Sequence, residues 1–260
     1  MKALIKLGGT LLEDSALRNS LAAQIAEASR SCQMTIVHGG GKQVTRFLED
    51  RGVRSRFVNG LRVSDEAVID AVVKVIAGTV NQQLVSALVA AGASAVGLSG
   101  VDGPLTIAEQ MLPELGSVGR PVHTDARLLD LLSSAGYLPA IACIASDRQG
   151  NVYNVNADQM AVSCAADWGA AKLLFLTDVP GVRNGTGEIL SELTAAESRA
   201  LVASGAAHGG MQAKLEAAEA GLRRGIGEVC IAPGREADIC ARLLAGEFVG
   251  TRIHKGREAA

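Results

Sequence analysis

The 260-residue sequence predicts an α/β fold in which helices cover both faces of a mostly parallel sheet. Short apolar runs alternate with stretches of helical periodicity along nearly the whole chain, which is the order of strand–helix–strand units. Three of the apolar runs end in small-residue loops, at Gly8-Gly9, at Gly39 to Gly41 and at Ser99-Gly100. Ligands of parallel sheets bind at the carboxyl ends of the strands, so these loops indicate a binding site.

The first half of the chain is expected to contain three strands, three helices and a hairpin. An Asn59-Gly60 pair predicts the hairpin between residues 56 and 63, because this pair tolerates the positive φ angles of a type I′ turn. Ser64 is the expected N-cap of a long apolar-rich helix that ends at Gly92. The expected strands are 3–7, 34–37 and 95–98, and the expected helices are 16–29, 42–48 and 64–91.

The second half continues the alternation. It follows a stretch, 105–124, that prolines interrupt and for which the sequence predicts no element. Thr194 and Glu197 form a capping box that opens a helix. The expected strands are 138–144, 152–155, 172–177, 228–231 and 251–253, and the other expected helices are 126–134, 157–168, 211–224 and 237–245.

Composition argues against several classes of protein. The net charge is −2 and the aromatics are few (one Trp, two Tyr, four Phe), so we expect no nucleic-acid partner. The N-terminus reaches Gly8-Gly9 before a signal sequence would be complete, and no apolar run is expected to approach the span of a membrane helix. The five cysteines lack Cys-x-x-Cys spacing, which indicates reduced, buried thiols in a cytoplasmic protein.

The run from Met34 to Gly41, an apolar strand that breaks into three glycines, predicts an anion-binding loop. Glycines let backbone N–H groups approach a charged ligand and allow positive φ angles. The loop is not a Walker A motif, because Ile36 stands where the first glycine would be and Gln43 follows Lys42. It is not a dinucleotide fingerprint either, because Val44 replaces the third glycine.

Three charged residues are candidates for chemistry from their position. Lys6 lies in an apolar strand before a glycine pair, so it is either an anion ligand or an edge lysine that reaches water. Lys214 lies in the first turns of a helix, where a cation opposes the helix dipole. Asp158 also lies in a first turn, where a carboxylate is favoured, so a capping role is an equal alternative.

Six motifs, in order along the chain, resemble those of the amino acid kinase family. The resemblance covers residues 2 to 253 and implies a three-layer α/β/α sandwich in one domain, 1–260. It also implies an N-lobe, about 1–155, for the amino acid and dimerisation, and a C-lobe, about 156–260, for ATP. The motifs are Lys6-Leu7-Gly8-Gly9, His38-Gly39-Gly40-Gly41, Asn59-Gly60-Leu61-Arg62-Val63, Asn154-Val155-Asn156-Ala157-Asp158-Gln159, Thr177-Asp178-Val179-Pro180-Gly181-Val182 and Gly209-Gly210-Met211-x-x-Lys214.

Within the family, the motifs look like those of kinases of arginine biosynthesis that phosphorylate the side-chain carboxylate of N-acetyl-L-glutamate with ATP. The resemblance implies that Lys6 and Lys214 stabilise the transferring phosphoryl group and that Asp158 holds both lysines. It implies Mg²⁺ on the ATP phosphates, with no metal ligand from protein side chains. The implied phosphate-binding residues are Gly8 and Gly9, the substrate-binding residues are Gly40, Gly41, Arg62 and Asn154, and the nucleotide-binding residues are Asp178, Val179, Pro180, Gly181, Val182, Arg183, Ala206, Ala207 and His208.

These roles agree with the chemistry of the reaction. A carboxylate with a pKa of about 4 is ionised at pH 7, so it needs no general base to attack phosphorus. Fixed lysines, glycine N–H groups and Mg²⁺ instead offset the repulsion between carboxylate and triphosphate. Arg62 suits an α-carboxylate because a guanidinium binds it bidentately. The chain departs from the family pattern at Gln212-Ala213, where relatives usually place an apolar residue and often a proline.

Three alternatives remain open: a carrier-protein-linked aminoadipate kinase of lysine biosynthesis, an N-succinylglutamate kinase, and a non-catalytic ligand sensor of the same fold. No basic cluster favours an acidic carrier protein, and the presence of Lys6, Asp158 and Lys214 argues against a sensor. The first strand begins almost at Met1, without the extra N-terminal helix of arginine-inhibited hexameric relatives. We therefore expect a homodimer that arginine does not inhibit in this way. The sequence does not predict whether a nitrogen-signalling regulatory protein binds.

Overall fold

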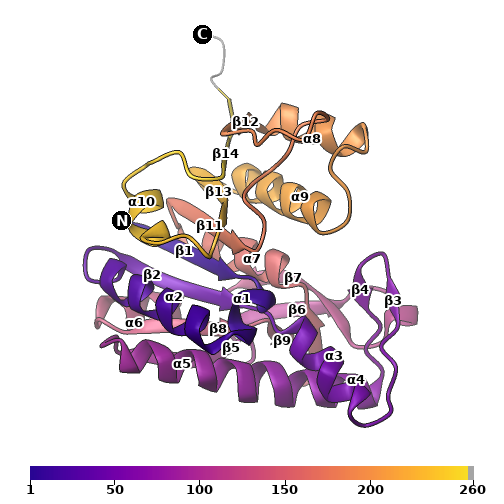
Figure 1. The fold of residues 1–260 in the computed structure, drawn as a ribbon. Helices are drawn as coiled ribbons and strands as arrows, with labels where there is room; N and C mark the ends of the chain where they lie inside the picture. The colour runs from indigo at the N-terminus through magenta and orange to yellow at the C-terminus, as the bar shows by residue number, and fades with distance from the viewer. Residues whose placement is uncertain (257–260) are drawn as a thin grey trace.

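The computed structural model describes residues 1–256 and has an eight-stranded sheet at its centre (Figure 1). The strand order is β12-β14-β13-β11-β1-β2-β8-β5, and every neighbouring pair is parallel except β13 with β14. The mostly parallel sheet expected from the sequence is therefore confirmed. The strands are β1 (Lys2–Leu7), β2 (Gln33–His38), β5 (Ala95–Ser99), β8 (Leu138–Ala142), β11 (Lys172–Thr177), β12 (Glu192–Thr194), β13 (Glu228–Pro233) and β14 (Thr251–His254).

Helices pack on both faces of this sheet and complete the expected three-layer sandwich. On one face, α2 (Ser15–Ala28) contacts both α5 (Asn81–Ala90) and α10 (Ile239–Leu244). On the other face, α7 (Ala157–Trp168) contacts α9 (Gly209–Arg223), and Trp168 Nε1 donates to Asp130 of α6 (Arg127–Ser134) at 3.0 Å. The remaining α-helices are α1 (Gly9–Glu13), α3 (Gly41–Glu49), α4 (Glu66–Val72) and α8 (Ala195–Ala203).

A second, smaller sheet contains most of the stretch for which the sequence predicted no element. Strands β6 (Thr106–Gln110) and β7 (Val118–Thr124) form an antiparallel pair, and β9 (Ile144–Ser146) and β10 (Val152–Val155) close the sheet on itself. Pro121 lies within β7, where the register shifts between Ile107 and Ala108 of the partner strand. A proline is tolerated at such an irregularity because its missing N–H breaks no regular ladder.

The long helix expected over 64–91 is present, but it consists of α4, the π-helix η1 (Val73–Val80) and α5. Its N-cap is Asp65 rather than Ser64, because the Asp65 side chain accepts from Val68 N at 3.0 Å, whereas the Ser64 hydroxyl donates to Arg62 O. By length and composition the stretch Glu66–Ala90 could cross a membrane, with a mean hydropathy of 1.4, so the expectation that no run approaches such a span is wrong. The core helix of a soluble protein meets the same criterion, and α5 packs on α2, β5 and β8.

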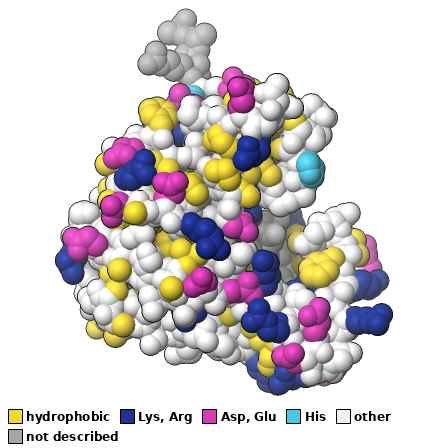
Figure 2. All heavy atoms as spheres, in the orientation of Figure 1, with side chains coloured by type: hydrophobic (Ala, Val, Ile, Leu, Met, Phe, Trp, Pro, Cys, Tyr) yellow, Lys and Arg dark blue, Asp and Glu magenta, His cyan; other side chains and the backbone are white. Residues whose placement is uncertain are grey.

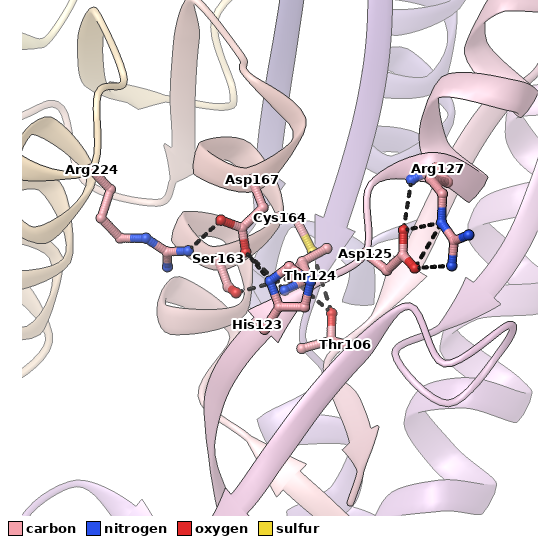
Figure 3. A network of polar contacts seen from close by, with 9 residues as sticks. All are labelled: Thr106, His123, Thr124, Asp125, Arg127, Ser163, Cys164, Asp167 and Arg224. Atoms are coloured by element: carbon pink, nitrogen blue, oxygen red, sulfur yellow. Dashed lines mark hydrogen bonds and ion pairs between the residues drawn. The ribbon is translucent and has the colours of Figure 1, made fainter. Parts of the chain in front are cut away.

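Asp167, near the end of α7, ties three elements together (Figure 3). Its Oδ2 accepts from the backbone N of Thr124 in β7 at 2.8 Å, and its Oδ1 accepts from Arg224, the C-cap of α9, at 2.7 Å. His123 Nδ1 lies 3.5 Å from Oδ2. These contacts fix the C-terminal ends of α7 and α9 relative to each other. The opposite halves of the same two helices carry the Asp158 and Lys214 singled out from the sequence.

Candidate active site

Two glycine loops lie side by side at the carboxyl ends of β1 and β2. A Cβ built on Gly9 would lie 3.4 Å from both the Cα and the N atom of Gly40. A Cβ on Gly39 would lie 3.4 Å from the Cβ of Ala157, so the start of α7 adjoins the same place. Gly40 is the N-cap of α3, and neither its N–H nor that of Gly41 has a hydrogen-bond partner within residues 1–256. The loops therefore present free amide donors, as the sequence predicted.

Gly8 does not match the role predicted for it as a phosphate donor. Its N–H donates to Leu176 O at 3.0 Å, which attaches the loop to the neighbouring strand β11. That amide is engaged within the chain and is not free for a ligand. The N–H of Gly9 has no partner in the part of the chain that the structure describes, so Gly9 is the candidate donor of the pair.

Asp158 brings the two predicted catalytic lysines together. Lys6 Nζ lies 2.6 Å from Asp158 Oδ1, and Lys214 Nζ lies 3.4 Å from Asp158 Oδ2. Lys6 comes from the end of β1 and Lys214 from the first turns of α9, where its Nζ also lies 3.4 Å from Gly210 O. Lys6 is 7% exposed and Asp158 is 6% exposed. The carboxylate therefore uses one oxygen for each lysine, in a largely buried group.

The Asp158 carboxylate is ionised in this setting. Burial alone would raise its pKa, but the charges of Lys6 and Lys214 and their hydrogen bonds outweigh burial and lower the pKa below the ordinary value. The position adds to this effect, because Asp158 lies in the first turn of α7, near the positive end of the helix dipole. Asn156 caps that turn by accepting from the N–H of Asp158 at 2.9 Å and of Gln159 at 3.2 Å.

Arg62 is a buried cation without an acidic partner. It is 8% exposed, and it forms no ion pair within 4.0 Å in residues 1–256. Its Nη2 donates to Gly41 O at 2.8 Å and to Thr45 Oγ1 at 2.7 Å, and its Nη1 donates to Ser55 Oγ. Burial lowers the pKa of Arg62, although the charge of Glu49 opposes this shift. A buried arginine without a counter-charge indicates a site for an anionic ligand.

Asn154 lies in the same pocket as Arg62 and is linked to it. Its Nδ2 donates to Ser64 Oγ at 3.1 Å, and the Ser64 hydroxyl donates to Arg62 O at 2.9 Å. The pocket has a volume of about 180 Å³ and is lined by the glycine loop, by hairpin residues, by the end of β10, and by Val72 of α4 and Ile76 of η1. The structure therefore brings together Gly40, Gly41, Arg62 and Asn154, the four residues expected to bind the substrate.

A second pocket of about 860 Å³ adjoins the first and contains Asp158 and Lys214. Gly60, Leu61 and Asn156 line both pockets, so these residues form the wall that the two share. Figure 2 shows this face of the molecule hollowed between the part that carries α9 and the part that carries the hairpin of β3 (Phe57–Val58) and β4 (Leu61–Arg62). A small pocket with a guanidinium thus opens beside a larger one with the ammonium group of Lys214, and Asp158 on the wall of the larger pocket also pairs with Lys6.

Asn156 is a residue of the site to which the sequence analysis gave no role. It caps the helix of Asp158 and lies between the two pockets. The available signal was an asparagine directly before an apolar helical run, which is typical of an N-cap. The Cys143 thiol also lines the smaller pocket, but burial raises its pKa to about 12, so it is a neutral thiol at pH 7.

The segments expected to border the nucleotide are only partly accessible. Asp178, Val179 and Pro180 are exposed at the end of β11, whereas Val182 and Ala207 are buried in the core. The backbone of Val182 is also engaged, because its N–H donates to Thr251 Oγ1 and its carbonyl accepts from Leu190 N, and the N–H of Ala207 donates to Leu201 O. Neither of these N–H groups is free for a ligand. No hydrogen bond joins 178–183 to 206–208 within the described residues, and neither segment lines the two pockets.

The sequence matches the model of the amino acid kinase family over residues 1–233. The chain belongs to the amino acid kinase family. It is 56% identical over 254 residues to an acetylglutamate kinase of Solibacter usitatus, with 97% of this chain and 99% of that protein covered. It is 41% identical over 257 residues to an acetylglutamate kinase of Acidobacterium capsulatum, with the same coverage.

Solved structures agree with this family assignment. An N-acetylglutamate synthase of Neisseria gonorrhoeae, complexed with coenzyme A and N-acetyl-glutamate, superposes with a TM-score of 0.86 at 25% identity. The match covers 99% of this chain but only 60% of the synthase. A protein of Streptococcus mutans superposes with a TM-score of 0.85 at 25% identity and is covered over 99% of its length. The amino acid kinase fold expected from the sequence is confirmed.

No group of three or more His, Cys, Asp or Glu side chains is arranged to hold a metal ion in residues 1–256. Asp158 also has both carboxylate oxygens next to lysines. The described part of this kinase therefore offers a divalent cation no ready set of protein ligands.

Proposed function

We propose that this chain uses ATP to phosphorylate the side-chain carboxylate of N-acetyl-L-glutamate, giving N-acetyl-L-glutamyl 5-phosphate in arginine biosynthesis. One observation carries the proposal: a buried arginine without an acidic partner lies in a pocket that adjoins two lysines held by one aspartate. This arrangement offers one site for a fixed carboxylate and another for a phosphoryl group. The names of the relatives, acetylglutamate kinases at up to 56% identity, support acetylglutamate as the amino acid.

In this proposal the smaller pocket binds the amino acid. The Arg62 guanidinium binds the α-carboxylate, because a planar guanidinium and a carboxylate pair bidentately. Both N–H groups of Nη2 donate within the chain, so the α-carboxylate takes the place of Gly41 O or Thr45 Oγ1 as an acceptor of Nη2 when this pair forms. Asn154, whose Nδ2 donates to Ser64 Oγ, contacts the substrate next to Arg62. The side chain of the amino acid then extends towards the free amides of Gly40 and Gly41. Its terminal carboxylate reaches the wall that the two pockets share.

Phosphoryl transfer takes place on the lysine side of that wall. An oxygen of the substrate carboxylate attacks the γ-phosphorus, the bond from that phosphorus to the β,γ-bridging oxygen breaks, and ADP leaves without any proton transfer. Lys6 and Lys214 stabilise the negative charge on the transferring group, and Asp158 fixes the positions of both ammonium groups. When bound, Mg²⁺ would neutralise charge on the ATP phosphates. Both oxygens of Asp158 are next to lysines, so this carboxylate would hold the two ammonium groups and not the metal.

We further propose that the two halves of the chain divide the substrates as an N-lobe, about 1–155, and a C-lobe, about 156–260. The strand order of the main sheet supports this division. Strands β1, β2, β8 and β5 form one half of the sheet, and the later strands β11, β13, β14 and β12 form the other half, with β1 next to β11 at the boundary. The adenosine of ATP would then bind near the exposed residues 178–180 and near His208.

A homodimer acting in the cytoplasm is the assembly we propose. Strand β5 is an edge strand of the main sheet, and Val89 in the adjacent helix α5 is 54% exposed. An exposed sheet edge and an exposed apolar helix residue suit association with a second copy. Light scattering should give the mass of a dimer, and a hexamer would contradict the proposal.

A substrate panel tests the proposed activity. The protein is incubated with ATP, Mg²⁺ and either N-acetylglutamate, N-succinylglutamate, glutamate or aspartate, and hydroxylamine traps any acyl phosphate as a hydroxamate. We expect ADP and hydroxamate to form in equal amounts with acetylglutamate and far more slowly with the other three. Faster turnover of N-succinylglutamate than of N-acetylglutamate would show that the succinyl compound is the substrate. The absence of hydroxamate with all four acids would contradict the proposed kinase activity.

A further inference from the structure

A buried polar pair lies beneath the glycine loop of residues 39–41. His38, the last residue of β2, and Asn81, the first residue of α5, are 0% and 2% exposed. Asn81 Nδ2 lies 2.9 Å from His38 Nε2 and 2.9 Å from Ala140 O. His38 Nδ1 lies 3.0 Å from Gly39 O. Neither side chain lines the two pockets, so the proposed function does not use them directly.

These contacts select one protonation state of the imidazole. Ala140 O can only accept, so it fixes the Asn81 amide with its Nδ2 towards Ala140 and His38. The Asn81 amide nitrogen can only donate, so His38 Nε2 accepts and Nδ1 carries the proton. Gly39 O accepts that proton. Burial lowers the pKa of His38 to about 4, although the hydrogen bond to Gly39 opposes this shift, so the ring is neutral at pH 7.

The hydrogen bond to Gly39 O sets the direction of the next amide. The carbonyl of Gly39 and the N–H of Gly40 belong to one planar trans peptide and point in opposite directions. Because His38 holds the carbonyl towards the interior, the Gly40 N–H points away from it. This N–H has no partner in the described chain, and a Cβ on Gly9 would lie 3.4 Å from its nitrogen. The free amide is therefore next to the second glycine loop.

The π-helix η1 supports the same loop. A Cβ built on Gly40 would lie 3.2 Å from Ile76 Cγ1 and 3.3 Å from Val80 Cγ2, so both side chains pack directly on the glycine backbone. Asn81 follows Val80 in the chain. A π-helix has more residues per turn than an α-helix and therefore shifts the direction of the residues that follow. In this helix, the residue after the π-segment faces β2 and β8.

We propose that His38 and Asn81 are positioning residues, which aim the Gly40 amide at the point where the carboxylate meets the phosphoryl group. The identity of the bound group rests on the proposed function. The chain of hydrogen bonds itself runs from Ala140 O through Asn81 and His38 to Gly39 O. It connects the core of the main sheet to one donor of the active site.

Two substitutions of His38 separate the contribution of its hydrogen bond to Gly39 O from that of its hydrogen bond with Asn81. His38→Gln places an amide oxygen near the position of Nε2 and so retains an acceptor for Asn81, but it loses the donor to Gly39 O. His38→Asn places an amide nitrogen near the position of Nδ1 and so retains the donor to Gly39 O. We expect His38→Gln to lower kcat roughly tenfold or more, and His38→Asn to restore most of that loss. His123→Gln, at an exposed histidine of β7, is the matched control and should keep the wild-type kcat and KM.

The tautomer can be measured without any activity. Imidazole ¹⁵N spectra should show His38 protonated on Nδ1 in the wild type, and Asn81→Ala should populate the Nε2–H form. A wild type protonated on Nε2, or equal kcat values in wild type, His38→Gln and His38→Asn, would overturn the positioning role. Failure of the proposed function gives a different result, in which the wild type makes no hydroxamate while the Nδ1–H tautomer still supports the hydrogen-bond chain.

Discussion

Lys6 Nζ lies 2.6 Å from Asp158 Oδ1, and the two side chains are 9% and 8% exposed. Burying an unpaired charge is energetically unfavourable, so the opposite charges of Lys6 and Asp158 offset the free-energy cost of burying each other. Lys214 adds a second positive charge at the other carboxylate oxygen. Two cations and one anion leave a surplus of positive charge beside the larger pocket. A transferring phosphoryl group is negative, so that surplus favours it.

Asp158→Asn should show what the shared carboxylate contributes. The substitution keeps the shape of the side chain but leaves the buried Lys6 and the partly buried Lys214 without a counter-charge. We expect the free energy of unfolding to fall by about 3 kcal/mol, as when one partner of a buried ion pair is removed. Urea denaturation measures the change, and the kinase assay should show a lower kcat. Asp125→Asn removes a carboxylate paired with the exposed Arg127, so it should leave both quantities nearly unchanged, and equal behaviour of the two variants would contradict this role.

Lys6→Ala and Lys214→Ala should each lower kcat by roughly 10²-fold or more, because each removes a fixed charge that stabilises the transition state. Circular dichroism should show that both variants remain folded. Lys2→Ala is the matched control, since Lys2 lies on the same strand as Lys6 but pairs with Asp130 near the surface. Wild-type rates in both active-site variants would remove the lysines from the mechanism.

Arg62→Ala should chiefly weaken the binding of acetylglutamate. The loss of a charged hydrogen-bonding partner costs about 1.5 to 3 kcal/mol, which corresponds to a rise in Kd of roughly 10- to 150-fold. Arg62→Lys should recover little, because an ammonium cannot form the bidentate pair. Calorimetry with acetylglutamate measures both affinities. Arg56→Ala, at an exposed arginine of the same region, should bind normally, and an unchanged affinity in Arg62→Ala would exclude the arginine from the site.

The strands and helices with a strong local pattern were predictable from the sequence. Helix α7 and strand β11 have the bounds that periodicity gave them, 157–168 and 172–177. The hairpin is confirmed by positive φ angles at Asn59 and Gly60, 49° and 78°. The capping box of Thr194 and Glu197 is also confirmed. In each case the signal is local, because it comes from neighbouring residues.

The features that the sequence did not reveal depend on contacts between distant segments. Strands β6 and β7 are stabilised by pairing with each other and with β9 and β10, which local patterns do not show. Hydrophobic periodicity does not distinguish a π-helix from an α-helix, so η1 was missed. Asn81 gave one signal, a polar residue inside an apolar helix, but its partners His38 and Ala140 are far away in the chain. The Gly8 N–H is engaged and the Gly9 N–H is free because β11 supplies an acceptor, Leu176 O, for Gly8 alone. Strand β11 is also far from this loop in the sequence.

Protonation of His38 should make stability depend on pH in a defined window. Its pKa is about 4 in the folded protein because of burial and 6.5 in the unfolded chain. Between these values the unfolded chain binds a proton that the folded protein does not, so the free energy of unfolding falls as the pH drops. From this group alone we expect a loss of about 3 kcal/mol between neutral pH and pH 4.

Asp158 changes the stability of the protein in a different pH range from His38. Burial alone would raise its pKa, but the charges of Lys6 and Lys214 lower it below 3.8, so its contribution is lost only at more acidic pH. Hydrogen bonds also lower the pKa values of Glu188 and Glu197, so these groups lose stability in the same direction as the pH falls towards 4. Comparing urea denaturation of the wild type with that of His38→Asn across the window therefore isolates the histidine. The slope of stability against pH should be smaller in His38→Asn than in the wild type and unchanged in His123→Gln. A wild-type stability that does not vary between these two pKa values would show that His38 takes up its proton in the folded protein as readily as in the unfolded chain.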